Sequence, residues 1–362
     1  MKYIFRVERI TKSSNSRTFL ILILSVFGGL LLSSLVFLFK GISPFLSLQK
    51  IMVGSFGSLY GIKETITKAI PLLLIGGGLS IAFHGKFWNI GAEGQILFGA
   101  IGATWVALYL GPGMESYIII PLLFLSGFIF GAIYGIIPAL LKTRFRINET
   151  IITLMLNYIA AEFVQFLVFG PWKGKTQYGF PYTDNFPQSA TLPLIPGSRI
   201  HYISLLVGIF ITLLAWFILN KTKFGYEVKV MGENPDAGKY AGINFTKTTI
   251  WIMVLSGGFA GLAGVGEVAG IHHHLSYPAS ISSGYGFTAI IVTWLARLNP
   301  IYIIFSSLFF GGILVGGDAI QTSLALPAAT VNVFNGLILF SLIIGGFFQD
   351  YKIRLHHETR KL

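Results

Sequence analysis

Residues 202–219 read YISLLVGIFITLLAWFIL, a continuous apolar run without a charged side chain. About 20 such residues in an α-helix, at 1.5 Å each, span the ~30 Å hydrocarbon core of a bilayer. Comparable runs recur along the 362-residue chain, which is 54% hydrophobic and 11% charged, whereas soluble proteins are usually about 25% charged. Because the runs are continuous and do not alternate, they indicate helices rather than a membrane barrel. The sequence therefore predicts an all-α polytopic membrane protein.

About ten membrane-spanning helices are expected. They lie near residues 19–40, 66–84, 93–110, 117–141, 150–170, 202–220, 248–271, 286–297, 300–317 and 331–348. The run at 286–297 is too short to cross a bilayer alone, so it predicts a short or re-entrant helix that packs inside the protein. Two glycine-rich stretches, 75–86 and 256–267, would run in opposite directions, which suggests two inverted repeats of five helices each.

The positive charges lie mostly on one side of this arrangement. Segments on the side of the N-terminus hold 19 of the 26 Lys and Arg residues. The positive-inside rule places that side in the cytoplasm and accounts for the net charge of +12 without nucleic acid. The predicted parts are a basic cytoplasmic N-terminus (1–18), a transmembrane domain (19–348) and a basic cytoplasmic tail (349–362). Within the domain, residues 171–200 form an outer loop and residues 221–247 form a cytoplasmic segment.

The sequence offers no set of residues for catalysis or for a metal. It has no cysteine, and its histidines lie at span ends and in the tail, where no Ser–His–Asp arrangement can form. The stretch GPWKGKT (170–176) resembles a phosphate-binding loop but has three residues where that loop has four between the first Gly and the Gly-Lys pair. We therefore expect no enzymatic activity and no cofactor.

The cytoplasmic segment contains VMGENPDAGKYAGIN (230–244), which predicts a short helix over 235–241. A preferred N-cap and a proline at the first helical position begin the helix. An acid near its start and a lysine near its end match the helix dipole, and a glycine ends it in a left-handed turn. These residues are Asn234, Pro235, Asp236, Lys239 and Gly242.

A helix this short is not stable alone in water, so it must pack against something. It would lie on its own protein or the membrane surface, or it would dock a cytoplasmic partner. The physical arguments leave these alternatives open.

Several motifs, in order, resemble the permeases of ABC importers of the ribose and nucleoside type, over roughly residues 65–348. Along the chain they are FHGKFWNIGAEGQILFGA (83–100), NETIITLMLNYIA (148–160), GENPDAGKYAGIN (232–244), AGINFTKTTIWIMVLSGGFAGLAGVGEVAG (241–270) and GYGFTAIIVTWLARLNP (284–300). The motif at 148–160 is similar to one in the nucleoside-importing branch. One departure is His84, where many members of the family carry Arg.

The resemblance implies a permease subunit that forms the path for a nucleoside or related sugar-like solute, with flavin-like heterocycles also open. Its partners would be cytoplasmic ABC ATPase subunits, a second permease (a copy of itself or a paralogue) and an extracytoplasmic binding protein that contacts the outer loop. It would lie in the cytoplasmic membrane of a prokaryote. The residues expected to couple to the ATPase are Gly232, Glu233, Asn234, Pro235, Asp236, Lys239 and Tyr240.

Polar residues at membrane depth are candidates for the solute path, because they are costly there and commonly functional. The candidates are Asn89, Glu93, Gln95, Asn157 and Glu267. The first three equally fit a cytoplasmic turn, Asn157 equally fits a bond between helices, and Glu267 equally fits a wet position near the outer loop. Trp88 and Tyr158 could stack on a flat ring. The alternative function is an ion-coupled secondary transporter or channel without ATPase partners.

Overall fold

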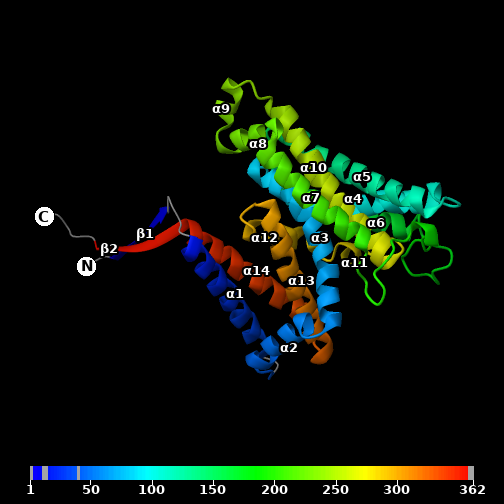
Figure 1. Cartoon of the computed structure of the whole chain (residues 1–362), viewed down its shortest axis with the longest axis horizontal. Helices are drawn as coiled ribbons and strands as arrows, with labels where there is room; N and C mark the ends of the chain where they lie inside the picture. Colours follow the sequence, from blue (N-terminus) through cyan, green and yellow to red (C-terminus); the bar gives the residue numbers. More distant parts are fainter. Residues whose placement is uncertain (1–2, 10–14, 39–40, 358–362) are drawn as a thin grey trace. The chain divides into compact units, whose positions relative to one another are not determined.

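The computed structural model describes residues 3–9, 15–38 and 41–357. Contacts divide the chain into two compact units, Leu59–Gly312 and the two chain ends, Met1–Ser58 with Ile313–Leu362. Nearly every element of both units is a helix (Figure 1). The prediction of an all-α polytopic membrane protein is confirmed. The domain limits after residues 18 and 348 stay a prediction, since α1 and α14 continue through both points.

The smaller unit consists of the chain ends. Its elements are β1 (Tyr3–Arg9), α1 (Asn15–Leu38), α2 (Pro44–Phe56), the end of α13 (Pro300–Ser323), α14 (Ala328–Asp350) and β2 (Tyr351–His357). Helix α1 packs along α14, where the rings of Phe37 and Phe334 lie 5.4 Å apart. The strands pair antiparallel, with Tyr3 opposite His357. Neither α2 nor the strands were predicted, although FRVE (5–8) alternates apolar and charged residues as a strand does.

The larger unit holds the remaining helices. They are α3 (Leu59–His84), α4 (Ala92–Trp105), α5 (Ser116–Phe145), α6 (Glu149–Phe169), α7 (Tyr202–Lys221), α8 (Lys223–Glu233), α9 (Pro235–Tyr240), α10 (Phe245–Val265), α11 (Pro278–Ser282), α12 (Tyr285–Leu295) and most of α13. The π-helical turns η1 (Val106–Leu110) and η3 (Gly266–His272) extend α4 and α10, and a short 3-10 turn, η2 (Gln188–Ala190), lies in the loop 171–200.

Among the described residues, seven helices are long and apolar enough to cross a membrane. They are α3, α4 with η1, α5, α6, α7, α10 with η3, and α13. Each coincides with a predicted span, and the short helix predicted at 286–297 is α12. The total of ten spans stays a prediction.

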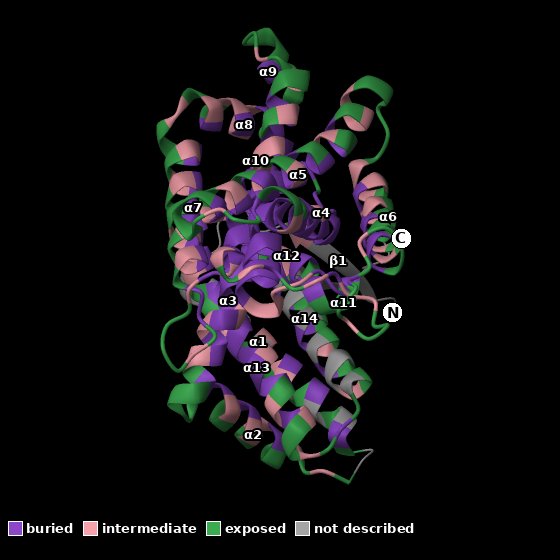
Figure 2. Cartoon of the chain, turned by 90° about the vertical axis from the view of Figure 1, so that its right-hand side faces the viewer, coloured by how far each residue is buried: buried purple, intermediate pink, exposed green. Residues whose placement is uncertain are grey.

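Helix α10 lies at the centre of the larger unit, in contact with α3, α4 and α5, within the buried region that is purple in Figure 2. Glycines permit this close packing: a Cβ added at Gly257 would meet the carbonyl oxygen of Gly131 at 2.5 Å, and one added at Gly261 would collide with Gly127. Small residues at four-residue spacing allow such approach of membrane helices. The spacing of Gly257 and Gly261 thus brings α10 against α5.

The two glycine-rich stretches lie against each other. A Cβ at Gly78 of α3 would meet Ser256 of α10, and a Cβ at Gly85 would meet Ile252. Because the later position on one helix meets the earlier on the other, the two helices run antiparallel here. This agrees with the opposite directions that the sequence predicts, while the inverted repeats themselves stay a prediction.

Candidate functional site

The loop between α3 and α4 carries a buried asparagine that joins three segments. Asn89 is fully buried, and its Nδ2 donates to Gln95 Oε1 and to Ser256 Oγ, each at 2.9 Å. Its Oδ1 accepts from the backbone N–H of Gly91 at 3.0 Å. Gln95 belongs to α4 and Ser256 to α10. The amide therefore fixes the loop to both helices.

A second asparagine fixes the same loop to α6. Asn157 Oδ1 accepts from the backbone N–H of Gly94 at 2.8 Å, and its Nδ2 donates to the carbonyl of Ile90 at 2.9 Å. Both contacts lie in the stretch NIGAEGQ, where a Cβ at Gly94 would meet Asn157 Oδ1 at 3.1 Å. The glycine thus lets the backbone approach the amide closely.

Glu93 joins the start of α4 to the start of α12. Its carboxylate accepts from the backbone N–H groups of Gly284, at 3.0 Å, and Gly286, at 2.7 Å. Gly284 has φ of +73°, in the left-handed region that favours glycine. A Cβ at Gly286 would meet Glu93 Oε2 at 2.7 Å. The motif GYG is therefore the partner of this glutamate.

We call Asn89, Glu93, Gln95, Asn157 and Ser256 the polar cluster. It contains four of the five residues predicted for the solute path and adds Ser256. Sequence reasoning missed Ser256 and the Gly284–Gly286 backbone, although both lie in quoted motifs. In this conformation the cluster's side chains bond to one another and to backbone groups of the α3–α4 loop, of α4 and of the start of α12.

Glu267 lies apart from the polar cluster. It follows Ser256 by eleven residues along a continuous helix, or about 16 Å. It lies in η3 and is 5% exposed, and one of its oxygens lies 3.9 Å from His272 Nε2. The wet position considered for Glu267 does not match this burial.

Helix α9 has at its two ends the capping residues that the sequence predicts. The Asn234 side chain accepts from the backbone N–H groups of Asp236 and Ala237, both at 3.1 Å. Lys239 Nζ lies 3.3 Å from a carboxylate oxygen of Asp236, and Gly242 has φ of +76°. The predicted short helix is confirmed, one residue shorter at its end than expected.

The residues predicted to couple to an ATPase comprise one buried and six exposed positions. Gly232 is buried in α8, where an added Cβ would collide with the carbonyl oxygen of His84 at the end of α3. The exposed ones are Glu233, Asn234, Pro235, Asp236, Lys239 and Tyr240. Tyr240 is 95% exposed. Helix α9 thus presents most of its surface at one end of the larger unit (Figures 1 and 2).

The family model described as branched-chain amino acid transport system / permease component matches residues 61–343. The chain belongs to this permease family. The permease is 31% identical to the glucose ABC transporter permease protein TsgB13 of Haloferax volcanii, over 93% of this chain and 90% of that protein. It is 30% identical to the guanosine ABC transporter permease protein NupP of Bacillus subtilis, over 88% and 91% of the two chains.

A third relative of the permease is the nucleoside ABC transporter permease protein NupB of Lactococcus lactis, 30% identical over 92% of both chains. Among solved structures, PsaBC from Streptococcus pneumoniae in complex with Fab matches 83% of this chain and 95% of that chain, at 16% identity and a TM-score of 0.45. The resemblance to ABC permeases is confirmed by the family match and by the three relatives from Haloferax, Bacillus and Lactococcus. The protein is an ABC transporter permease subunit.

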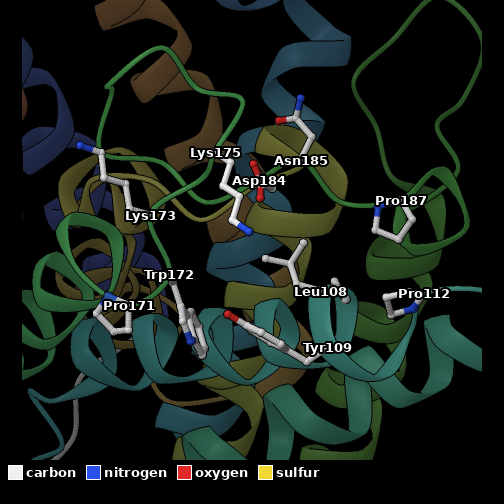
Figure 3. A pocket seen from close by; sticks show the side chains of 11 residues that line it. Leu108, Tyr109, Pro112, Pro171, Trp172, Lys173, Lys175, Asp184, Asn185 and Pro187 are labelled. Carbon is white, nitrogen blue, oxygen red and sulfur yellow. The ribbon is translucent and has the colours of Figure 1, made fainter.

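Residues of the loop 171–200 and of η1 line a pocket of about 510 Å³. Figure 3 shows the rings of Tyr109 and Trp172 on one side and the side chains of Lys175 and Asp184 on the other. Hydrogen bonds from Thr176 hold the pKa of Asp184 below its ordinary value, so this carboxylate is charged at neutral pH. The pocket therefore combines an aromatic wall with charges of both signs.

Proposed function

We propose that this permease forms the translocation path of an ABC importer for a nucleoside or a related sugar. The observation that carries the proposal is α9, a fully capped helix whose surface is almost entirely exposed. The helix packs against α8 and α10 of its own chain, but five of its six residues stay exposed. The family supplies a partner for this surface, because ABC permeases work with ABC ATPases.

The solute class is inferred from the relatives and from one motif. The relatives are named for glucose, guanosine and nucleosides, which share a hydroxylated ring. The motif at 148–160, similar to the nucleoside-importing branch, favours a nucleoside. An ion-coupled transporter or channel is not favoured, since the relatives are ABC permeases.

The expected assembly contains two permeases, two ATPase subunits and a binding protein in the cytoplasmic membrane of a prokaryote, with both termini in the cytoplasm. The exposed residues of α9 would contact an ATPase. The outer loop 171–200 would contact the binding protein, and its pocket, with Lys173 and Lys175, suits an acidic side chain on that partner.

A movement of α9 can be transmitted to the membrane helices through α8 and α10. Helix α8 contacts α3 through Gly232 and His84, and α9 is followed directly by α10. The polar cluster then connects α10 to α4, α6 and α12. Nucleotide-driven displacement of α9 would therefore shift these helices together, as alternating access requires. We also propose that Asn89, Glu93, Gln95, Asn157 and Glu267 come to contact the solute during this movement.

The test is uptake by proteoliposomes that hold the permease with its ATPase and binding protein. We expect uptake of labelled guanosine or glucose that requires ATP inside the vesicle and the binding protein outside. Uptake that persists without the ATPase subunits, or that follows an ion gradient, would contradict the proposal. Stimulation of ATP hydrolysis by the loaded binding protein gives an independent readout.

A further inference from the structure

Helix α6 has one covered face and one exposed face. It packs against α4, α5 and α11. Its covered residues include Asn157, Ala160 and Val164. On its opposite face a stripe of exposed side chains recurs at helical spacing. The stripe consists of Ile151, Met155, Tyr158, Glu162, Phe166 and Phe169.

Glu162 lies at the centre of this exposed stripe, in a helix that is long and apolar enough to cross a membrane. It precedes the end of α6 at Phe169 by seven residues, which places it about 10 Å below the outer end of the helix. A carboxylate at such depth is costly against lipid and is found facing protein or a water-filled cavity. The side chain therefore does not face hydrocarbon in the assembled transporter.

The surroundings of Glu162 are built for hydrogen bonding. Gln165 Nε2 donates to Glu162 Oε1 at 3.0 Å, which orients the carboxylate. One turn away lies Tyr158, 64% exposed, with a flat ring and a hydroxyl. Carboxylate oxygens only accept hydrogen bonds, so they pair with donors such as sugar hydroxyls. A negative charge at this depth also repels anions.

We propose that the outward face of α6 lines the water-filled solute path, and that Glu162 binds paired hydroxyls of a neutral, sugar-containing solute there. The inference rests on the proposed function and narrows the class of solute. The solute would be an uncharged nucleoside or sugar rather than a phosphorylated one, and Tyr158 would stack on its ring. Asn157 and Tyr158 thus have opposite roles, the first holding the loop and the second facing the path.

The first test uses the absence of cysteine from the chain. Single cysteines replace Tyr158 and Glu162 on the exposed face, or Ala160 and Val164 on the covered face, in the complete transporter. We expect a charged, membrane-impermeant thiol reagent to label only the first pair. Saturating guanosine, or glucose if that is the transported probe, should slow labelling at position 162.

Two results of this test would overturn the inference. Labelling of Glu162→Cys by a membrane-soluble maleimide but not by the charged reagent would place the face against lipid. A spontaneous disulfide between two copies of Glu162→Cys, without access for the charged reagent, would make the face a dry contact between permeases. Labelling does not depend on which solute is carried, so it remains decisive even if neither guanosine nor glucose is taken up.

The second test measures selectivity. We expect Glu162→Gln to lower guanosine uptake about tenfold or more, since the lost charged acceptor weakens hydrogen bonds that form in the path. Uptake of 2′-deoxyguanosine, which lacks one hydroxyl, should fall much less. Glu162→Asp should restore part of the guanosine uptake. Glu115→Gln, at an exposed position before α5, is the control and should match the wild type.

Equal losses for guanosine and 2′-deoxyguanosine, or wild-type uptake of both by Glu162→Gln, would overturn the role of Glu162. If the wild-type complex carries neither probe, the proposed solute is wrong, and the labelling pattern still decides whether α6 lines an aqueous path. The two failures are therefore distinguishable.

Discussion

The carboxylate of Glu93 accepts a hydrogen bond from the backbone N–H of Gly286 at 2.7 Å, although 193 positions separate the two residues. A second bond reaches Gly284. This contact fixes the short helix α12 against α4, although α12 alone could not cross a bilayer. A hydrogen bond within a protein contributes about 0.5–1.5 kcal/mol net, so the pair is a substantial link between α4 and α12.

We therefore expect Glu93→Ala to lower both thermal stability and uptake, because two buried N–H groups lose their acceptor. Glu93→Gln keeps one acceptor oxygen and should lie between Glu93→Ala and the wild type. Unfolding of the detergent-solubilised protein measures the first effect, and vesicle uptake measures the second. Glu115→Ala is the control for loss of an exposed carboxylate. A wild-type melting temperature for Glu93→Ala would show that the contact contributes little.

Asn157→Leu removes both hydrogen bonds that hold the NIGAEGQ stretch to α6. Leucine is similar in size, so the variant leaves the backbone N–H of Gly94 and the carbonyl of Ile90 unsatisfied without creating a large cavity. Each buried unsatisfied group costs about 1–3 kcal/mol. We expect a clear drop in melting temperature, whereas Asn220→Ala, at an exposed position at the end of α7, should change little. Equal melting curves for the two variants would contradict the prediction.

The close contact between α5 and α10 predicts that Gly→Ala destabilises the protein at Gly261. The same change at Gly336 of α14, outside this contact, should not. At Gly261 the added methyl would collide with the carbonyl of Gly127, and overpacking of this kind costs about 1–3 kcal/mol. At Gly336 of α14 an added Cβ meets nothing within 4 Å, so alanine should be neutral or stabilise the helix by up to about 1 kcal/mol. Thermal unfolding of the two variants tests the contrast. Equal melting temperatures of the two variants would contradict close packing of α5 against α10.

The orientation of the chain is tested by labelling single cysteines. By the positive-inside rule, cysteines at Lys175 and Ser280 should react with an impermeant reagent from outside. Cysteines at Lys223 and Lys239 should react only after the membrane is permeabilised. All four positions are exposed, so an absence of reaction reflects sidedness rather than burial. Reaction of Lys239→Cys from outside would reverse the orientation and move α9 away from any cytoplasmic ATPase.

Local and long-range features differ in how well the sequence predicted them. The caps of α9 depend on contacts within a few residues, such as Asn234 with Asp236, so the sequence alone identified them. Span positions follow from apolar length and also agree with the helices. The polar cluster depends on contacts such as Asn89 with Ser256, 167 positions apart, which periodicity does not reveal. The burial of Glu267 depends likewise on packing around η3.

The N-terminal cap of α9 offers a way to test whether this helix couples the permease to an ATPase. Replacing Asn234 with Ala removes both N-terminal hydrogen bonds, at a cost of about 0.5–2 kcal/mol in helix stability. Pro235→Gly removes the fixed backbone angle at the first helical position. This loss is small for a protein held together by its membrane helices, but large for a six-residue helix. The double variant should therefore insert normally and lose co-purification of the ATPase or stimulated ATP hydrolysis.

Tyr240→Ala separates docking from helix formation, because the residue is 95% exposed and contributes little to the fold. Large aromatic side chains commonly dominate binding energy at interfaces. Tyr226→Ala, on the neighbouring helix α8 and 63% exposed, is the matched control. We expect Tyr240→Ala to weaken pull-down of the ATPase, and Tyr226→Ala to leave it intact. If Tyr240→Ala and the double variant both retain wild-type pull-down and ATP turnover, with loss of the helix verified in the latter, α9 is not the coupling element. The ATPase would then have to engage another cytoplasmic surface of the permease.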